Sequence, residues 1–185
     1  MNVFEALVLG IVQGLTEFLP VSSSGHLVLF QHLFGLREAQ LFFDISVHTG
    51  TLMAVILFFR KEIFSILASL VRFARMLAAK KVSPADAMQD ADVKMALLII
   101  AGSVPTGIIG ILFHKMAEEI FSSVFLVGWT LIATGILLWL TRSVKNPGSG
   151  IEGFSIRQAL GIGLVQGIAI LPGISRSGST IAAGL

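Results

Sequence analysis

The chain has 185 residues, of which 55% are hydrophobic and only 13% are charged. Soluble domains carry about 25% charged residues, so this composition predicts an integral membrane protein. The net charge is only +2 and the basic residues are concentrated in loops, which disfavours nucleic-acid binding. Cysteine is absent, so disulfides and thiol chemistry are excluded.

The first apolar region, residues 3–34, is interrupted by a proline and a run of serines. Pro20 removes a backbone donor, and the serines at 22–24 compete for backbone hydrogen bonds. The stretch after the interruption, residues 27–34, is too short to cross a bilayer. We therefore predict a re-entrant helical hairpin whose two ends lie outside, with a single kinked span as the alternative.

Three later segments have about the 20 residues that are needed to cross a hydrocarbon core: 41–59, 93–113 and 124–141. The loop between the first two contains six lysines and arginines, so the positive-inside rule places it in the cytoplasm. Within this loop, residues 61–80 combine an apolar stripe with a basic face. This pattern predicts an amphipathic helix along the cytoplasmic membrane surface, with a solvated connector helix as the alternative.

Residues 142–157 are predicted to be a cytoplasmic linker, because three basic residues surround an Asn-Pro-Gly-Ser-Gly stretch. A second interrupted apolar segment, residues 158–185, follows. Three crossings separate the two interruptions, and an odd number inverts one relative to the other. We therefore predict an all-α polytopic membrane protein with inverted-topology repeats, 1–141 and the start of a second at 158–185, each with a re-entrant broken-helix hairpin.

The two interruptions share a sequence pattern. The first reads Gln-Gly-Leu-Thr-Glu-Phe-Leu-Pro-Val-Ser-Ser-Ser-Gly-His over residues 13–26, and the second reads Gln-Gly-Ile-Ala-Ile-Leu-Pro-Gly-Ile-Ser-Arg-Ser-Gly-Ser-Thr over residues 166–180. Ionisable groups at membrane depth indicate a functional site. A carboxylate such as Glu17 needs a cation there, and Arg176 or a divalent metal could supply it. An ion pair that only holds the hairpins in register is the structural alternative.

Hydroxyls, glycine-exposed amides and a guanidinium together fit a phosphate better than they fit a cation or an apolar ligand. The residues predicted to bind it are Ser22, Ser24, Gly25, Ser175, Ser177, Gly178 and Thr180. Serine and glycine that only allow tight helix packing are the alternative. His26 is predicted to transfer a proton. Asp44 and His48, four residues apart, either reach the same cavity or pair with each other.

On these residues the chain resembles the undecaprenyl-diphosphate phosphatase, or bacitracin-resistance, family along nearly its whole length. The motifs at 13–26 and 172–180 carry the resemblance. It implies hydrolysis of a polyprenyl diphosphate lipid, undecaprenyl diphosphate, to the monophosphate carrier lipid of cell-wall synthesis. It also implies an active site on the outer face of the bacterial plasma membrane and a divalent cation, Mg²⁺ or Ca²⁺. We expect Gln13, Glu17 and Asp44 to be its ligands.

In the mechanism that we expect, Ser23 attacks the terminal phosphorus, His26 handles the proton, and Glu17 holds the metal or orients the nucleophile. Arg176 offsets the charge on the phosphoryl group. Attack by metal-bound water is the alternative step, and a lipid-phosphate transporter or flippase is the alternative function. Relatives continue beyond Leu185, so we expect a C-terminally truncated chain, and its activity and any homo-oligomer are left open.

Overall fold

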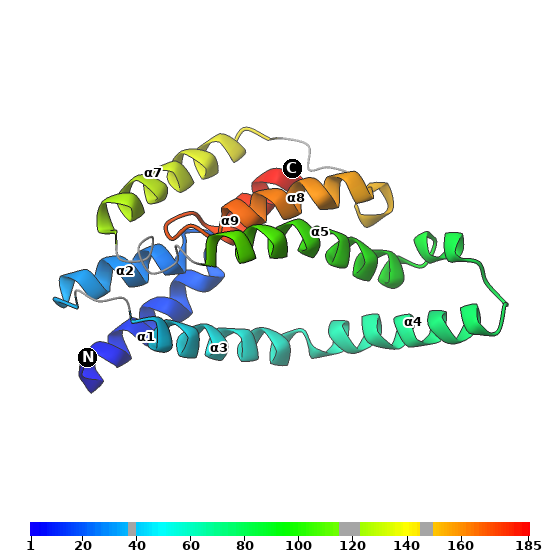
Figure 1. The fold of residues 1–185 in the computed structure, drawn as a ribbon, viewed down its shortest axis with the longest axis horizontal. Coiled ribbons are helices and arrows are strands. Elements are labelled where there is room, and N and C mark those ends of the chain that lie inside the picture. Colours follow the sequence, from blue (N-terminus) through cyan, green and yellow to red (C-terminus); the bar gives the residue numbers. More distant parts are fainter. Residues whose placement is uncertain (37–39, 115–122, 145–149) are drawn as a thin grey trace.

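The structure is a computed structural model that describes residues 1–36, 40–114, 123–144 and 150–185. Every regular element in these ranges is helical, as the sequence predicts (Figure 1). In chain order they are α1 (Val3–Phe18), α2 (Ser23–Leu33), α3 (Leu41–Phe58), α4 (Arg60–Ala78), the 3₁₀ turn η1 (Pro84–Met88), α5 (Ala91–Phe113), α7 (Val124–Thr141), the 3₁₀ turn η3 (Ile151–Gly153), α8 (Ile156–Ile168) and α9 (Arg176–Gly184).

Three of these helices, α3, α5 and α7, are long and apolar enough to cross a membrane. They begin and end within two residues of the three spans that the sequence predicts. The agreement follows from hydropathy, because a helix satisfies its own backbone hydrogen bonds and is therefore stable wherever an apolar segment meets lipid. The expectation of a polytopic membrane protein is confirmed at this level.

Each of the two predicted interruptions separates a pair of helices. Residues 19–22 lie between α1 and α2, and residues 169–175 lie between α8 and α9. In the first break the backbone at Leu19 is extended (φ −92°, ψ 142°), and Ser22 has φ 68°, a value that is uncommon for a residue with a side chain. Residues 3–34 are therefore two helices joined by a break and not one kinked helix.

Helix α4 coincides with the amphipathic segment predicted at 61–80 and follows α3 almost in line (Figure 1). It packs along the start of α5, where Arg72 forms an ion pair with Asp90 at 3.1 Å. Asp90 is also the N-cap of α5. Its hydrogen bond from the Val93 amide, helped by Arg72, holds the pKa of the carboxyl below its usual value, so the contact persists at neutral pH.

Helices α5 and α8 form the most extensive contact between any two elements of the described chain. Their backbones touch, since a Cβ added at Gly163 would lie 2.0 Å from the carbonyl oxygen of Gly102. Thr106 also donates a hydrogen bond of 2.8 Å to the Gly163 carbonyl. Such close approach needs small residues, and it fixes α8 and the break that follows it against a membrane-length helix. Of the predicted linker at 142–157, residues 145–149 lie outside the described ranges.

Candidate active site

The helices that follow the two breaks begin in the same way. The Ser22 hydroxyl accepts a hydrogen bond from the Gly25 amide at 3.3 Å, and the Ser175 hydroxyl accepts one from the Gly178 amide at 3.0 Å. In each case the capping hydroxyl also lies 3.3–3.4 Å from the hydroxyl of the serine two residues later. The shared Ser-x-Ser-Gly sequence therefore produces the same N-terminal cap twice.

The two breaks pack against each other in the left part of the molecule as drawn in Figure 1. A Cβ added at Gly25 would lie 2.7 Å from the Cα atom of Gly173, and one added at Gly178 would lie 3.0 Å from the carbonyl oxygen of Pro20. Gly178 and Gly173 each follow their counterparts, Gly25 and Pro20, by 153 positions (178 − 25 and 173 − 20). The two contacts are therefore reciprocal, as at an interface between two copies related by a twofold axis.

Helix α7 holds the second break in place. Thr130 donates to the Pro172 carbonyl at 2.6 Å, and Thr134 donates to the Gly173 carbonyl at 2.7 Å. The Thr134 oxygen also accepts from the Ser175 amide at 3.0 Å. Gly173 has φ 93°, and a Cβ there would collide with the Thr130 hydroxyl. Buried backbone outside a helix needs such partners for its polar groups.

A cavity of about 740 Å³ lies between the two breaks and α3. Most of the predicted site residues line it: Glu17, Ser22, Ser23, Ser24, Asp44, Ser175, Arg176, Ser177 and Thr180. The acid of the first break and the arginine of the second therefore share one cavity. Gln13, Gly25, His26 and Gly178 were also predicted for the site, but they are not among the residues that line the cavity.

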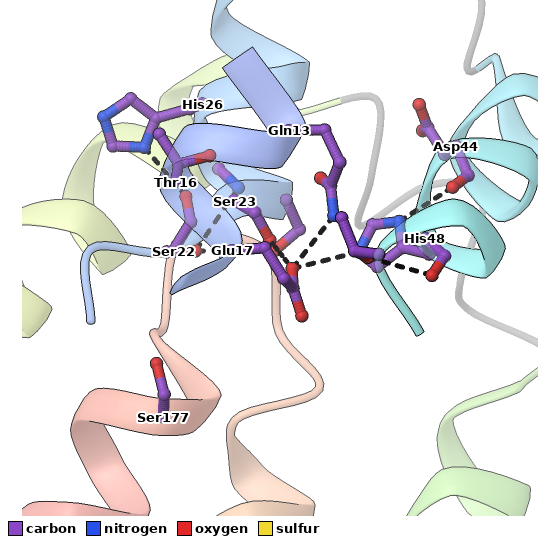
Figure 2. Close-up of polar contacts among 12 residues, drawn as sticks. Gln13, Thr16, Glu17, Ser22, Ser23, His26, Asp44, His48 and Ser177 are labelled. Carbon is purple, nitrogen blue, oxygen red and sulfur yellow. Dashed lines mark hydrogen bonds and ion pairs between the residues drawn. The ribbon is translucent and has the colours of Figure 1, made fainter. Parts of the chain in front are cut away.

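One carboxylate oxygen of Glu17 is the centre of the polar contacts (Figure 2). Its Oε2 atom accepts a hydrogen bond from Ser23 Oγ at 2.5 Å and another from Gln13 Nε2 at 2.9 Å, and His48 Nε2 lies 3.9 Å away. Ser23 is buried, whereas the Glu17 side chain is 32% exposed toward the cavity. A serine hydroxyl bonded directly to a carboxylate is an arrangement in which the carboxylate can take the hydroxyl proton.

The guanidinium of Arg176 has no hydrogen-bond or ion-pair partner within the described part of the chain, and the side chain is exposed on the cavity wall. It forms no ion pair with Glu17, so the alternative in which the two only hold the hairpins in register is not supported. The His48 imidazole lies near Glu17 instead, with Nε2 3.9 Å from Oε2. An unpaired guanidinium on a cavity wall is available to a phosphate.

The first-turn amides of both short helices also lack acceptors. Within the described residues, no acceptor meets the backbone N–H groups of Ser23 and Ser24 at the start of α2. The same holds for Arg176 and Ser177 at the start of α9. The side chains of all four residues line the cavity. Free amides and the positive ends of two helix dipoles at one cavity favour an anion there.

The two histidines are placed differently from what the sequence suggests. His26 donates through Nδ1 to the Ser22 carbonyl at 2.8 Å, and its ring points away from Glu17 (Figure 2). His48 donates through Nδ1 to the Asp44 carbonyl at 2.7 Å, which directs Nε2 toward Glu17. The imidazole that faces the cavity is therefore His48, for which the sequence offered only the four-residue spacing from Asp44.

Gln31 is a residue of this site that the sequence reasoning missed. It is buried in α2 and donates from Nε2 to Asp44 Oδ1 at 2.7 Å. Asp44 itself is buried at the edge of the cavity, so this hydrogen bond holds its carboxylate in place. Only a contact between α2 and α3 identifies Gln31, because no motif contains it.

The predicted metal ligands fit a divalent cation in part. Glu17 and Asp44 line the cavity with carboxylate oxygens, the donors that Mg²⁺ and Ca²⁺ prefer. Within the described residues no three His, Asp or Glu side chains are grouped closely enough to hold an ion by themselves, but Mg²⁺ commonly completes its shell with phosphate and water. Gln13 does not join them, because its Nε2 donates to Glu17 and its Oε1 is buried without a partner.

Comparison with known proteins identifies the family of the chain. Residues 6–185 match the family described as bacitracin resistance protein BacA. The chain is 54% identical to the undecaprenyl-diphosphatase of Desulfosudis oleivorans and 51% identical to that of Desulforapulum autotrophicum. All of the chain is aligned in both comparisons, and it spans 67% of each relative. The chain therefore belongs to the bacitracin resistance protein BacA family.

Proposed function

We propose that this protein hydrolyses undecaprenyl diphosphate to undecaprenyl phosphate and inorganic phosphate, and so recycles the carrier lipid for cell-wall synthesis. The observation that carries the proposal is one cavity that holds an unpaired arginine, Arg176, beside a serine bonded to a carboxylate, the Ser23–Glu17 pair. The relatives named undecaprenyl-diphosphatase support the same substrate. This set of groups can bind a phosphate, and the apolar polyprenyl chain can lie in the lipid that surrounds the protein.

In the proposed complex the diphosphate lies between the starts of α2 and α9. Arg176 and the free amides of the two first turns offset its charge, and the hydroxyls of Ser24 and Ser177 donate to its oxygens. Positioned charges of this kind supply most of the catalysis in phosphoryl transfer. Thr180, one turn into α9, lies on the same cavity wall.

Ser23 Oγ attacks the terminal phosphorus, and its proton passes to Glu17 Oε2, to which it is already bonded. The bond between the terminal phosphorus and the bridging oxygen breaks, and undecaprenyl phosphate leaves. Water then attacks the phosphoserine, which releases inorganic phosphate and restores the hydroxyl. Glu17 passes the serine proton to the departing phosphate oxygen of undecaprenyl phosphate. It then takes a proton from the attacking water and returns one to Ser23 Oγ, so it serves as the base in both halves of this sequence.

We propose Mg²⁺ or Ca²⁺ as the cofactor, held by Glu17 and Asp44 with the oxygens of the substrate. When bound, the ion would neutralise part of the negative charge on the diphosphate. The sequence-based prediction that His26 carries a proton is not used in this reaction sequence, because its ring is turned from the cavity and the imidazole near Glu17 is that of His48. Direct attack by water, with Ser23 only binding phosphate, remains the alternative first step.

We further propose that the chain has inverted repeats, residues 1–141 and 158–185, and that each begins with a re-entrant pair, α1–α2 and α8–α9. The reciprocal contacts between the breaks and the odd number of membrane-length helices between them support this arrangement. With residues 60–92 in the cytoplasm, the cavity opens to the outer face of the plasma membrane.

Phosphate release from undecaprenyl diphosphate by the purified protein in detergent, with and without chelator, tests the function. We expect hydrolysis by the wild type and at least about a 100-fold loss in Arg176→Ala, as when one oxyanion-hole donor is removed. Arg176→Lys should restore only part of the rate, since lysine cannot bind bidentately. Tight binding without turnover would instead favour a transporter.

A rapid-quench experiment separates the two first steps. A phosphoserine trapped at position 23 in the wild type, and absent in Ser23→Ala, supports attack by the serine. A wild-type burst without any phosphoprotein supports direct attack by water.

A further inference from the structure

The cavity extends along most of α3. The α3 residues that line it recur every three or four positions, so they form one face of the helix. They are Leu41, Asp44, Ile45, His48, Thr49, Thr51, Leu52 and Val55. From Leu41 to Val55 there are 14 steps along the helix (55 − 41), or about 21 Å at about 1.5 Å per residue. The cavity is therefore elongated, and the phosphate site occupies only one end of it.

The lining of this face changes in polarity along the helix. His48 lies 3.9 Å from Glu17, and Asp44 precedes it by one turn on the same face, with the apolar Leu41 and Ile45 beside them. Further along α3 the lining holds no charged residue: Thr49 and Thr51 are followed by Leu52 and Val55, which lie one and two turns after His48. The second break adds apolar side chains to the same cavity, among them Ile170. A charged end and an apolar end are therefore continuous in one cavity.

We propose that the apolar end holds the first isoprene units of the substrate, and that Leu52 and Val55 determine how the enzyme recognises the polyprenyl chain. The inference rests on the proposed function. The occupant follows from continuity, because a polyprenyl diphosphate carries its chain covalently attached to the charged group that the other end binds. A chain placed along α3 also runs from the outer face into the bilayer, where the rest of an undecaprenyl group can lie in lipid.

Matched substitutions on the two faces of α3 test this inference. Met53 and Leu57 lie two positions before and after Val55, hence on the opposite face, and neither lines the cavity. Both are exposed, at 59% and 62%, much as Leu52 is at 58%. The double variant Leu52→Ala/Val55→Ala is therefore compared with the double variant Met53→Ala/Leu57→Ala. Truncation adds no bulk, so the double variants should fold.

The substrates are undecaprenyl, farnesyl and isopentenyl diphosphate, which share the charged group and differ in chain length. We expect the Leu52/Val55 variant to lose about tenfold or more in kcat/KM for the two longer substrates, in the range typical of a hydrophobic pocket. For isopentenyl diphosphate it should change less than threefold. The Met53/Leu57 variant should match the wild type on all three substrates.

Tryptophan at position 52 or 53 provides a second measurement. Leu52→Trp should fill the apolar end and abolish the preference for farnesyl over isopentenyl diphosphate, whereas Met53→Trp should preserve it. Equal losses on all three substrates, or equal effects from the two faces, would overturn the inference and indicate that bilayer lipid alone contacts Leu52 and Val55. If the wild type hydrolyses none of the substrates, the proposed function fails instead.

Discussion

Glu17 concentrates its contacts on one oxygen, which accepts hydrogen bonds from Ser23 and Gln13. The second donor, Gln13, is fully buried and reaches the carboxylate from one helical turn earlier. It cannot touch a ligand in the cavity, so we assign it the role of holding Glu17 in position for Ser23. Glutamine suits this role because its amide supplies a donor without adding charge.

Gln13→Leu should therefore lower kcat and leave KM nearly unchanged. Loss of a hydrogen bond to a charged group costs about 1.5–3 kcal/mol, which corresponds to about a 10–100-fold loss in rate. Steady-state kinetics with undecaprenyl diphosphate measure both constants. A higher KM with normal kcat would show that Gln13 contributes to ligand binding, as a metal ligand would.

The two histidines can be distinguished by a parallel pair of substitutions. His48→Ala removes the imidazole that faces Glu17, and a group that handles a proton at the reacting centre contributes about 10²–10⁴-fold. His26→Ala removes a hydrogen bond to the Ser22 carbonyl, worth about 1 kcal/mol, or about fivefold. We expect the larger loss of kcat in His48→Ala. The reverse order would restore the sequence-based role of His26.

The sequence predicts most of the polar side of the cavity, because Glu17, Ser23 and Arg176 lie in short motifs whose chemistry is recognisable without a fold. It does not predict which imidazole faces the cavity. His26 stands next to the serine motif, but one step along a helix turns a side chain by about 100°. His48 is remote in sequence and comes to Glu17 only because α3 packs on α1.

At the scale of elements, the second break depends on α7. The buried Thr134 hydroxyl donates to the Gly173 carbonyl and accepts from the Ser175 amide. Both groups are buried backbone polar groups, and each costs about 1–3 kcal/mol when it is left without a partner. Arg176 follows directly after Ser175, so α7 also sets the position of the arginine.

Thr134→Val keeps the shape of the side chain and removes both hydrogen bonds. We expect it to destabilise the protein by at least about 2 kcal/mol and to reduce hydrolysis as well. Thr141→Val is the matched control on the same helix, because its hydroxyl donates only to the Leu138 carbonyl of α7 itself. Thermal unfolding in detergent compares the two, and equal melting temperatures would show that the break does not need α7.

The membrane-length helices follow from hydropathy, whereas the geometry of the breaks does not. Proline and serine indicate where α1 must end, but the positive φ of Ser22 cannot be deduced from them. The packing of Gly25 on Gly173 joins segments that are nearly 150 positions apart. Such a contact depends on the completed arrangement of all the helices, and local sequence carries no information about it.

At the scale of the whole molecule, the active site has two unequal halves. The first break supplies Glu17 and Ser23, and the second supplies Arg176 at the position that corresponds to Ser23 (23 + 153 = 176). A repeat with strict symmetry would place two like residues at these positions. In the proposed reaction, this difference between the two breaks places the nucleophile on one side of the phosphate and a cation on the other.

The proposed inverted repeat requires the two helix pairs to enter the membrane from opposite faces, and the absence of cysteine from the chain makes this requirement easy to test. Single cysteines at four exposed positions report the topology: His32, Lys81, His114 and Arg157. With an impermeant maleimide on intact cells, positions 32 and 114 should label, and positions 81 and 157 should label only after permeabilisation. Labelling of 32 and 157 from the same face would put α1–α2 and α8–α9 in parallel. An inverted repeat would then not explain why Glu17 and Arg176 line the same cavity.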